Sequence, residues 1–294
     1  MTYKQQLSIQ ADRVVDLDWY KTGIPTAFDP YLSSPSHRVR ASGGVPRLAF
    51  ELLAALGLSG LSTRHELVAI VNYYRNVALP EKQGSYKRAL HLLDAQGLWR
   101  TYQTSFGHRR IVFVCLTDLG RSLLQTEGLP AVSSEWDAIE AGHRRASDGS
   151  QVEHTAAICM FQYHARQRGY LTLVCPTGDF GNAEPDSLIE LGAQQLYVEV
   201  QGRGSNPIKR RNKWQNQATL QGCVAICAQT PRMAVHFAEE AQAPLRIPRG
   251  LITDLATLAT GKPVNLWTHR WHSAYMPLEP LTEADGAPLF PVRP

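Results

Sequence analysis

The sequence has few cysteines and no long hydrophobic run, and both absences narrow what the chain can be. Its five cysteines are odd in number and form no CxxC pair. Cys223 and Cys227 lack a second pair at zinc-ligand spacing, so we expect reduced thiols and no structural zinc. No run approaches the roughly 18 apolar residues of a membrane span. The first residues, MTYKQQLSIQADRVVD, contain no apolar signal core, and we therefore expect a cytoplasmic protein with no membrane partner.

The chain also lacks a large excess of positive over negative charge. Charged residues make up 19% of the chain, and the formal net charge is +4. Any surface for a polyanion must therefore come from local clustering of lysine and arginine. The 294 residues exceed the usual length of one domain, which is about 100–200 residues, so we expect two domains.

Residues 1–44 mix polar residues, prolines and glycines without sustained periodicity, and we interpret them as an extended arm. The basic segment 37–40 near its end has two interpretations, a contact with DNA phosphates or a solvated linker.

Three helices are predicted after this arm. Leucines recur at helical spacing between residues 48 and 56, and we expect Gly57 to end this first helix. Thr63 and Glu66 form a capping box that begins a second helix. A third helix opens at residues 84–88 and ends at Gly97. Its predicted exposed face carries Ser85, Tyr86, Lys87, Arg88 and His91.

A hairpin and a closing helix are predicted to follow. Residues 98–102 and 111–116 have the composition of two strands, and the segment SFGHRR between them is a hairpin tip. The tip ends in His108, Arg109 and Arg110. Thr117 is expected to cap the next helix.

This order of elements over residues 45–128 resembles a winged helix-turn-helix domain. The resemblance implies that the third helix enters the major groove of double-stranded DNA and that the hairpin touches the backbone. The alternative is a winged helix used for protein contacts. The basic residues at the start of the third helix and at the hairpin tip favour DNA.

Residues 129–150 lose the periodicity, and we interpret them as a linker or a bridging helix held by Trp136 and Ile139. The remaining residues, 151–294, form the second predicted domain. Its pattern predicts a helix at 152–168 and strands at 171–174, 186–191 and 195–201. A helix within 209–221, a strand at 223–228, a helix at 232–241 and a short element near 251–258 complete it.

The second domain resembles the PD-(D/E)XK nucleases in this order of elements and in one motif. Pro185 and Asp186 are followed by twelve residues, numbers 187 to 198, and then by Glu199, Val200 and Gln201. A gap of this length places Asp186 and Glu199 side by side on neighbouring strands. The resemblance implies a restriction-endonuclease-like mixed sheet flanked by helices, in an α/β and α+β protein. It also implies that the two carboxylates hold Mg²⁺ or Mn²⁺ for phosphodiester hydrolysis.

Three further residues complete the implied site. Gln201 stands where the superfamily usually has lysine, and Lys213, in the next helix, is the candidate substitute. Glu153 matches a position where relatives often add an acid to the metal site. Each residue also has an alternative role outside a metal site. Asp186 can be a turn residue and Glu199 a surface residue of a strand. Glu153 can be an acid favoured at a helix N-terminus, and Lys213 can contact a phosphate.

A basic stretch lies between Gln201 and Lys213. It contains Lys209, Arg210 and Arg211 with no acidic residue, and we predict that these three side chains contact DNA. The alternative is a flexible basic surface loop.

The two domains together resemble the replication-relaxation family of mobile-element proteins, which is found near plasmid replication, mobilisation and defence genes. Two hypotheses follow: a Mg²⁺-dependent DNA endonuclease, and a non-catalytic DNA-binding accessory or regulatory protein with a degenerate nuclease fold. Other proteins of the same element and a second copy of the chain are the further partners that this resemblance implies.

Overall fold

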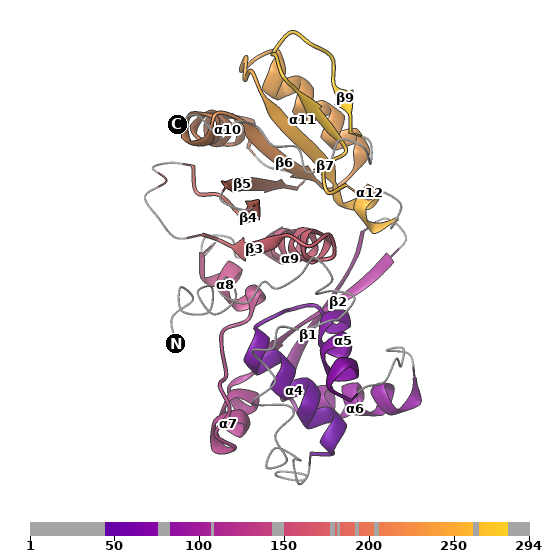
Figure 1. Cartoon of the computed structure of the whole chain (residues 1–294). Coiled ribbons are helices and arrows are strands. Elements are labelled where there is room, and N and C mark those ends of the chain that lie inside the picture. The colour runs from indigo at the N-terminus through magenta and orange to yellow at the C-terminus, as the bar shows by residue number, and fades with distance from the viewer. Residues whose placement is uncertain are drawn as a thin grey trace. The chain divides into compact units, whose positions relative to one another are not determined.

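The computed structural model describes residues 45–75, 83–106, 109–142, 150–176, 180, 183–191, 194–202, 206–260 and 265–281. The predicted arm of residues 1–44 and His108 of the hairpin tip lie outside the described residues. The protein is a mixture of helices and strands (Figure 1). It divides into two compact units, residues 1–104 with 111–141 and residues 105–110 with 142–294. Within the described residues, no helix is both long and apolar enough to cross a membrane.

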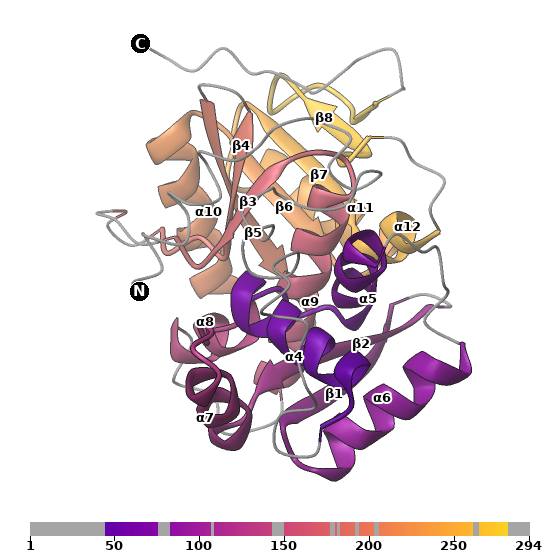
Figure 2. The same ribbon diagram turned by 60° about the horizontal axis from the view of Figure 1, so that its bottom comes forward.

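The first unit contains helices and one hairpin, seen together in Figure 2. Its elements are α4 (Arg47–Ser59), α5 (Arg64–Tyr74), α6 (Gly84–Ala95), β1 (Trp99–Phe106), β2 (Arg109–Leu116), α7 (Asp118–Thr126) and α8 (Glu135–Gly142). Helix α4 is the central one, because it packs against α5, α6 and α7 and buries Leu52, Leu53 and Leu56 completely. The predicted order of three helices, a hairpin and a closing helix is confirmed.

The predicted end of the first helix was wrong. Gly57 lies inside α4, and Gly60, with φ of 68°, is the left-handed residue that ends it. A Cβ atom on Gly57 would lie 2.3 Å from Leu124 Cδ1 and 2.9 Å from the carbonyl oxygen of Pro130. This glycine therefore permits close packing within the helix rather than a turn after it.

Two other predicted helix ends of the first unit hold. Thr117 caps α7 by accepting a hydrogen bond from the backbone N–H of Gly120, and Gly97, with φ of 63°, follows the end of α6. The hairpin strands are longer than predicted, since β1 reaches Phe106 and β2 begins at Arg109.

The predicted linker begins with a packed helix. The indole of Trp136, on α8, is fully buried and stacks on Tyr102 with ring centroids 4.1 Å apart. Ile139 is also buried. The first unit therefore extends through residue 141, beyond the boundary at residue 128 that the loss of periodicity indicated.

The second unit has a seven-stranded mixed sheet. Its elements are α9 (Ser150–Arg166), β3 (Leu171–Val174), β4 (Ser187–Leu191), β5 (Gln194–Gln201), α10 (Pro207–Gln221), β6 (Val224–Ala228), α11 (Pro231–Gln242), β7 (Gly250–Asp254), α12 (Leu255–Ala259), β8 (His269–Trp271) and β9 (Glu279–Pro280). The strands follow one another in chain order across the sheet. Neighbouring strands are antiparallel except for the two pairs β5–β6 and β6–β7, which are parallel.

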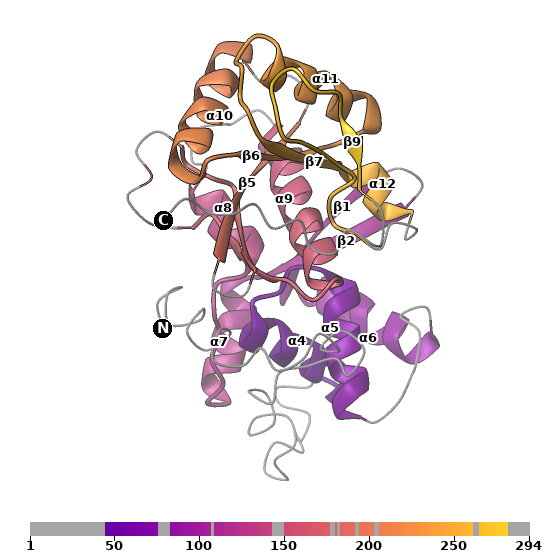
Figure 3. The same cartoon turned by 45° about the horizontal axis from the view of Figure 1, so that its top comes forward.

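Helices cover both faces of this sheet. Figures 1 and 3 show α10 and α11 on one side of β5, β6 and β7, with α9 and α12 on the other. Both faces of β6 and β7 are consequently buried, as the continuous apolar sequence of β6 requires. The predicted order of a helix, three strands, a helix and a strand is confirmed, whereas β8 and β9 were not predicted as strands.

Candidate functional site

Two carboxylates lie next to each other at one end of β4 and β5. Asp186 directly precedes β4, and Glu199 lies on β5. The antiparallel register pairs Ser187 with Val198, so Asp186 continues the pairing opposite Glu199. The Oδ2 atom of Asp186 accepts a 2.8 Å hydrogen bond from the backbone N–H of Val200, which fixes the Asp186 carboxylate against the neighbouring strand. The adjacency predicted from the twelve-residue gap is confirmed.

Lys213 brings a positive charge to both carboxylates. Its Nζ atom donates to Oε1 of Glu199 at 2.7 Å and lies 3.5 Å from Oδ1 of Asp186. Lys213 is carried by α10, whose start is set by the side chain of Asn206, which accepts from two backbone N–H groups, and by Pro207. The lysine expected from the next helix therefore reaches the pair.

The cluster is buried and contains two acids and one lysine. Asp186 is fully buried, Glu199 is 4% exposed and the Lys213 side chain is 24% exposed. Burial and the charge of Asp186 raise the pKa of Glu199, although Lys213 opposes this shift. Burial alone would lower the pKa of Lys213, but the two carboxylates outweigh it and raise that pKa. Lys213 is thus held as the ammonium, and its single charge does not neutralise both acids.

The helix α9 contributes a histidine that the sequence analysis did not select. His154 Nε2 lies 3.5 Å from Asp186 Oδ1, whereas Glu153 is exposed. The prediction that Glu153 joins the carboxylates is therefore corrected in favour of its neighbour. Residues 155–166 are all buried, so the periodicity of this helix does not distinguish the two positions.

Gln201 and Cys175 lie close to the carboxylates. Gln201 is two residues after Glu199 on β5 and therefore shares its face of the sheet. It is 8% exposed. The backbone N–H of Cys175 donates to the carbonyl oxygen of Asp186 at 2.9 Å. Burial and the charge of Asp186 raise the pKa of the Cys175 thiol to about 12, so this cysteine is no thiolate nucleophile at neutral pH.

The basic residues of α10 have different environments, and one prediction about them was wrong. Arg210 is buried and forms an ion pair with Glu240, and its guanidinium lies 4.9 Å from the ring centre of Phe237. It ties α10 to α11 and is not exposed for a phosphate. Arg211 also pairs with Glu240 but remains 43% exposed, and Lys209 is exposed.

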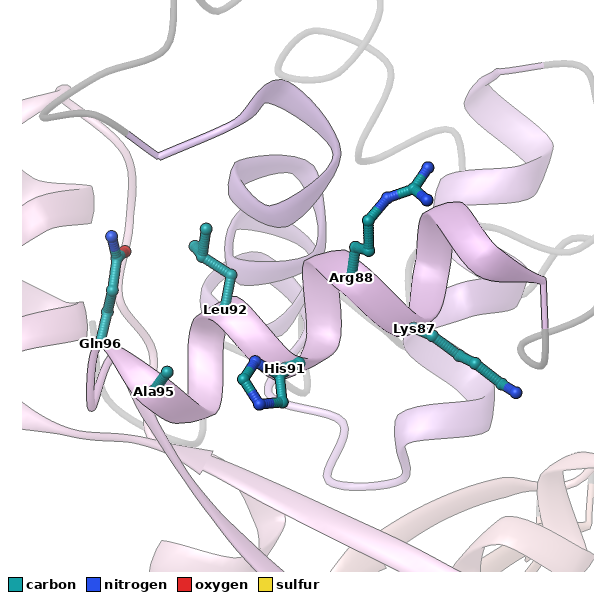
Figure 4. A pocket seen from close by; sticks show the side chains of 6 residues that line it. All are labelled: Lys87, Arg88, His91, Leu92, Ala95 and Gln96. Atoms are coloured by element: carbon teal, nitrogen blue, oxygen red, sulfur yellow. The ribbon is translucent and has the colours of Figure 1, made fainter.

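A second candidate surface lies on α6. A hollow of about 460 Å³ is lined by Lys87, Arg88, His91, Leu92, Ala95 and Gln96. Figure 4 shows Arg88, Leu92 and Gln96 on one side of the helix axis and Lys87 and His91 on the other. The acid of this helix points elsewhere, because Asp94 Oδ1 accepts hydrogen bonds from Trp99 Nε1 and Thr101 Oγ1. The lining of the hollow therefore contains basic, amide and apolar groups without a carboxylate.

The structure corrects one residue of the predicted exposed face and leaves others in place. Tyr86 is buried, its hydroxyl donates to Asn72, and burial raises its pKa to about 12. Tyr86 therefore packs α6 against the core of the first unit and does not face solvent. Ser85 is half-buried, whereas Lys87, Arg88 and His91 are exposed. In the hairpin, Arg109 begins β2 and Arg110 is exposed.

Comparisons with protein-family models, curated proteins and solved structures give no match. Within the part of the chain that the structure describes, no group of three or more histidine, cysteine, aspartate or glutamate side chains is arranged to hold a metal ion. The two surfaces described above are therefore the features of the molecule that bear on its function.

Proposed function

We propose that the protein is a DNA-binding protein with a Mg²⁺-dependent or Mn²⁺-dependent phosphodiesterase site. In this proposal the first unit is a winged helix-turn-helix and the second is a PD-(D/E)XK nuclease domain. The observation that carries it is the convergence of Asp186, Glu199 and Lys213, from three separate elements, in one buried cluster. The family resemblance adds a mobile-element or defence setting and partner proteins from the same element.

The residues present fit a divalent ion in charge and in donor type. Burial and the neighbouring charge of Asp186 raise the pKa of Glu199 despite the ammonium of Lys213, so a further positive charge beside the two acids would be stabilised there. Mg²⁺ is held in many sites by one or two carboxylates, several waters and substrate phosphate oxygens, so a cage of three protein acids is not required. Asp186 and Glu199 would hold the ion, and it would neutralise the scissile phosphate and lower the pKa of a water.

The chain's own residues then have distinct roles. Val200 N–H fixes Asp186 through Oδ2, which keeps that carboxylate in place before substrate arrives. Lys213 provides the only protein cation in the described residues with a hydrogen bond to Glu199, and it would hold a phosphate oxygen. Gln201 would orient the attacking water through its amide, which donates and accepts hydrogen bonds. It carries no positive charge and cannot act as a general base.

DNA binding is assigned to α6 and the hairpin. Lys87 and Arg88 are exposed near the start of α6, where the recognition helix of a winged domain contacts DNA. Leu92 and Ala95 form an apolar part of the same hollow, which suits the methyl group of thymine in the major groove. A surface for phosphates alone would need only donors, so this mixture favours contacts with base edges as well.

A cleavage assay tests the proposal. Supercoiled and linear DNA are incubated with the full chain and Mg²⁺ or Mn²⁺, and Asp186→Asn and Glu199→Gln are expected to abolish cleavage while DNA binding persists. Glu190→Gln is the matched control, since Glu190 is a half-buried strand residue of β4 at the other end from Asp186. Cleavage that survives both site variants would reject the assignment.

The second candidate is a non-catalytic DNA-binding accessory or regulatory protein. The specific observation in its favour is the position of Lys213, whose ammonium already bridges the two carboxylates, combined with glutamine in place of lysine at 201. A wild-type protein that binds DNA but cuts none with either ion would support this candidate.

A further inference from the structure

Nitrogen atoms lie close to both carboxylate oxygens of Asp186. Oδ2 accepts from the backbone N–H of Val200 at 2.8 Å. Oδ1 lies 3.5 Å from Lys213 Nζ and also 3.5 Å from His154 Nε2. Three elements, β5, α10 and α9, therefore converge on a single fully buried acid.

His154 is placed by a rigid element and retains access to solvent. It lies near the start of α9, whose residues 155–166 are all buried, and α9 packs on β3, β4 and β5. The imidazole itself is 28% exposed. The ring is thus held beside Asp186 on a part of the cluster that solvent reaches.

The two donors on Oδ1 differ in what happens when a divalent ion binds. The ammonium of Lys213 and a divalent ion compete for the same pair of carboxylates, because both positive charges are stabilised there. An imidazole N–H at the position of His154 can donate to Oδ1 while the ion is bound, since a carboxylate oxygen has two lone pairs. Hydrogen bonds of this kind orient ligating carboxylates, and their loss weakens metal binding about 10–100-fold.

We infer that His154 is a positioning residue that orients the Asp186 carboxylate for a divalent cation. This inference rests on the proposed function, because it presupposes that Asp186 holds an ion. It assigns to His154 a role that the sequence pattern had given to Glu153, and the role is indirect: the histidine holds the ligand and not the metal.

The experiment measures Mn²⁺ binding by the full chain without DNA, using the electron paramagnetic resonance signal of free Mn²⁺. His154→Ala is expected to weaken binding about 10–100-fold. His154→Gln, whose amide N–H can replace the Nε2 donor, is expected to recover part of the loss. His236→Ala is the matched control, because His236 is exposed on α11. Metal-free thermal melts accompany each variant.

The outcomes separate the two proposals. Equal Mn²⁺ affinity of His154→Ala and wild type would overturn the inference and leave the metal site standing. A loss that His154→Gln does not recover, together with a lower melting temperature, would also overturn it, because the histidine would then be structural. A wild-type chain that binds no Mn²⁺ would overturn the inference, whereas the cleavage assay with DNA decides the proposed phosphodiesterase site separately.

Discussion

The ammonium of Lys213 and the carboxylate of Glu199 are joined by a 2.7 Å hydrogen bond between α10 and β5. Asp186 contributes a second carboxylate to the same nitrogen at 3.5 Å. Both acids are buried, and the positive charge of Lys213 reduces the repulsion between them. Changes in the charge of this cluster should therefore change the free energy of unfolding as well as the activity.

Removal of the lysine charge should destabilise the protein. Lys213→Met retains the aliphatic chain but leaves two buried carboxylates without their cation, a loss of about 3 kcal/mol at neutral pH. The deficit should shrink as pH falls, because Glu199, whose pKa is raised, takes up a proton. Urea unfolding at several pH values measures it. Lys209→Met, on the exposed side of α10, is the control, and an equal loss in both variants would contradict this account.

Neutralising one acid should have the opposite effect. The pKa of Glu199 is raised above its ordinary value of 4.5, so above pH 4.5 the unfolded chain ionises first and the folded state loses stability as pH rises toward the raised pKa. Glu199→Gln removes this loss. Its melting temperature at pH 8 should exceed that of wild type by about 2–4 °C for each kcal/mol recovered. A melting temperature equal to or below that of wild type would show that the charge imbalance is not costly.

Some of this site could be predicted from the sequence, and the parts that could not depend on long-range packing. Asp186 and Glu199 are separated by one hairpin, so their spacing alone determined that they meet. Lys213 follows on the next helix of the chain. These contacts are short in sequence, and local patterns are informative about them.

His154 and Arg210 show where this reasoning stops. His154 meets Asp186 across 31 intervening residues, and no local periodicity separates it from Glu153. Arg210 resembles its basic neighbours in sequence, but a buried glutamate thirty positions later, Glu240, takes it into the interior. Gly57 was misread for a related reason: its partner is Leu124 on α7, which the sequence of α4 does not reveal.

Binding by the first unit should depend on salt in proportion to its phosphate contacts. If Lys87 and Arg88 each contact one phosphate, the double alanine variant should reduce the slope of log affinity against log salt by about 2. Arg232→Ala, exposed on α11, should not change the slope. Mobility-shift titrations at several salt concentrations measure it.

Tyr86→Phe should leave the slope unchanged, because Tyr86 is buried. It should lower the free energy of unfolding by about 1 kcal/mol through the lost hydrogen bond to Asn72.

Two glycines of the first unit should respond oppositely to alanine. A Cβ atom on Gly120, in α7, would lie 2.0 Å from the carbonyl oxygen of Leu98, a backbone atom that cannot turn aside. Gly120→Ala should therefore destabilise the protein by about 1–3 kcal/mol. At Gly84 the nearest atom is 3.9 Å away, so Gly84→Ala in α6 should be neutral or stabilising by up to about 1 kcal/mol. Thermal melts of the two variants test the contrast, which equal effects would contradict.

In the proposed nuclease fold, Gln201 stands at the position where lysine is usual. Gln201 shares the sheet face of Glu199, so a lysine there would bring a second ammonium to a cluster that lacks one positive charge. Gln201→Lys is expected to keep or increase cleavage, and to lower the pKa of Glu199 toward its ordinary value. Stability at pH 8 should then depend less on pH than in wild type.

The lysine can also be moved rather than added. Lys213→Gln alone should lose cleavage and stability, while the double variant Gln201→Lys with Lys213→Gln should recover much of both if either strand or helix can supply the charge. Single-turnover cleavage and metal-free urea unfolding are measured for all four proteins. Recovery of stability without recovery of cleavage would show that the lysine must act from α10, because the charge alone would then suffice for the fold but not for holding the phosphate.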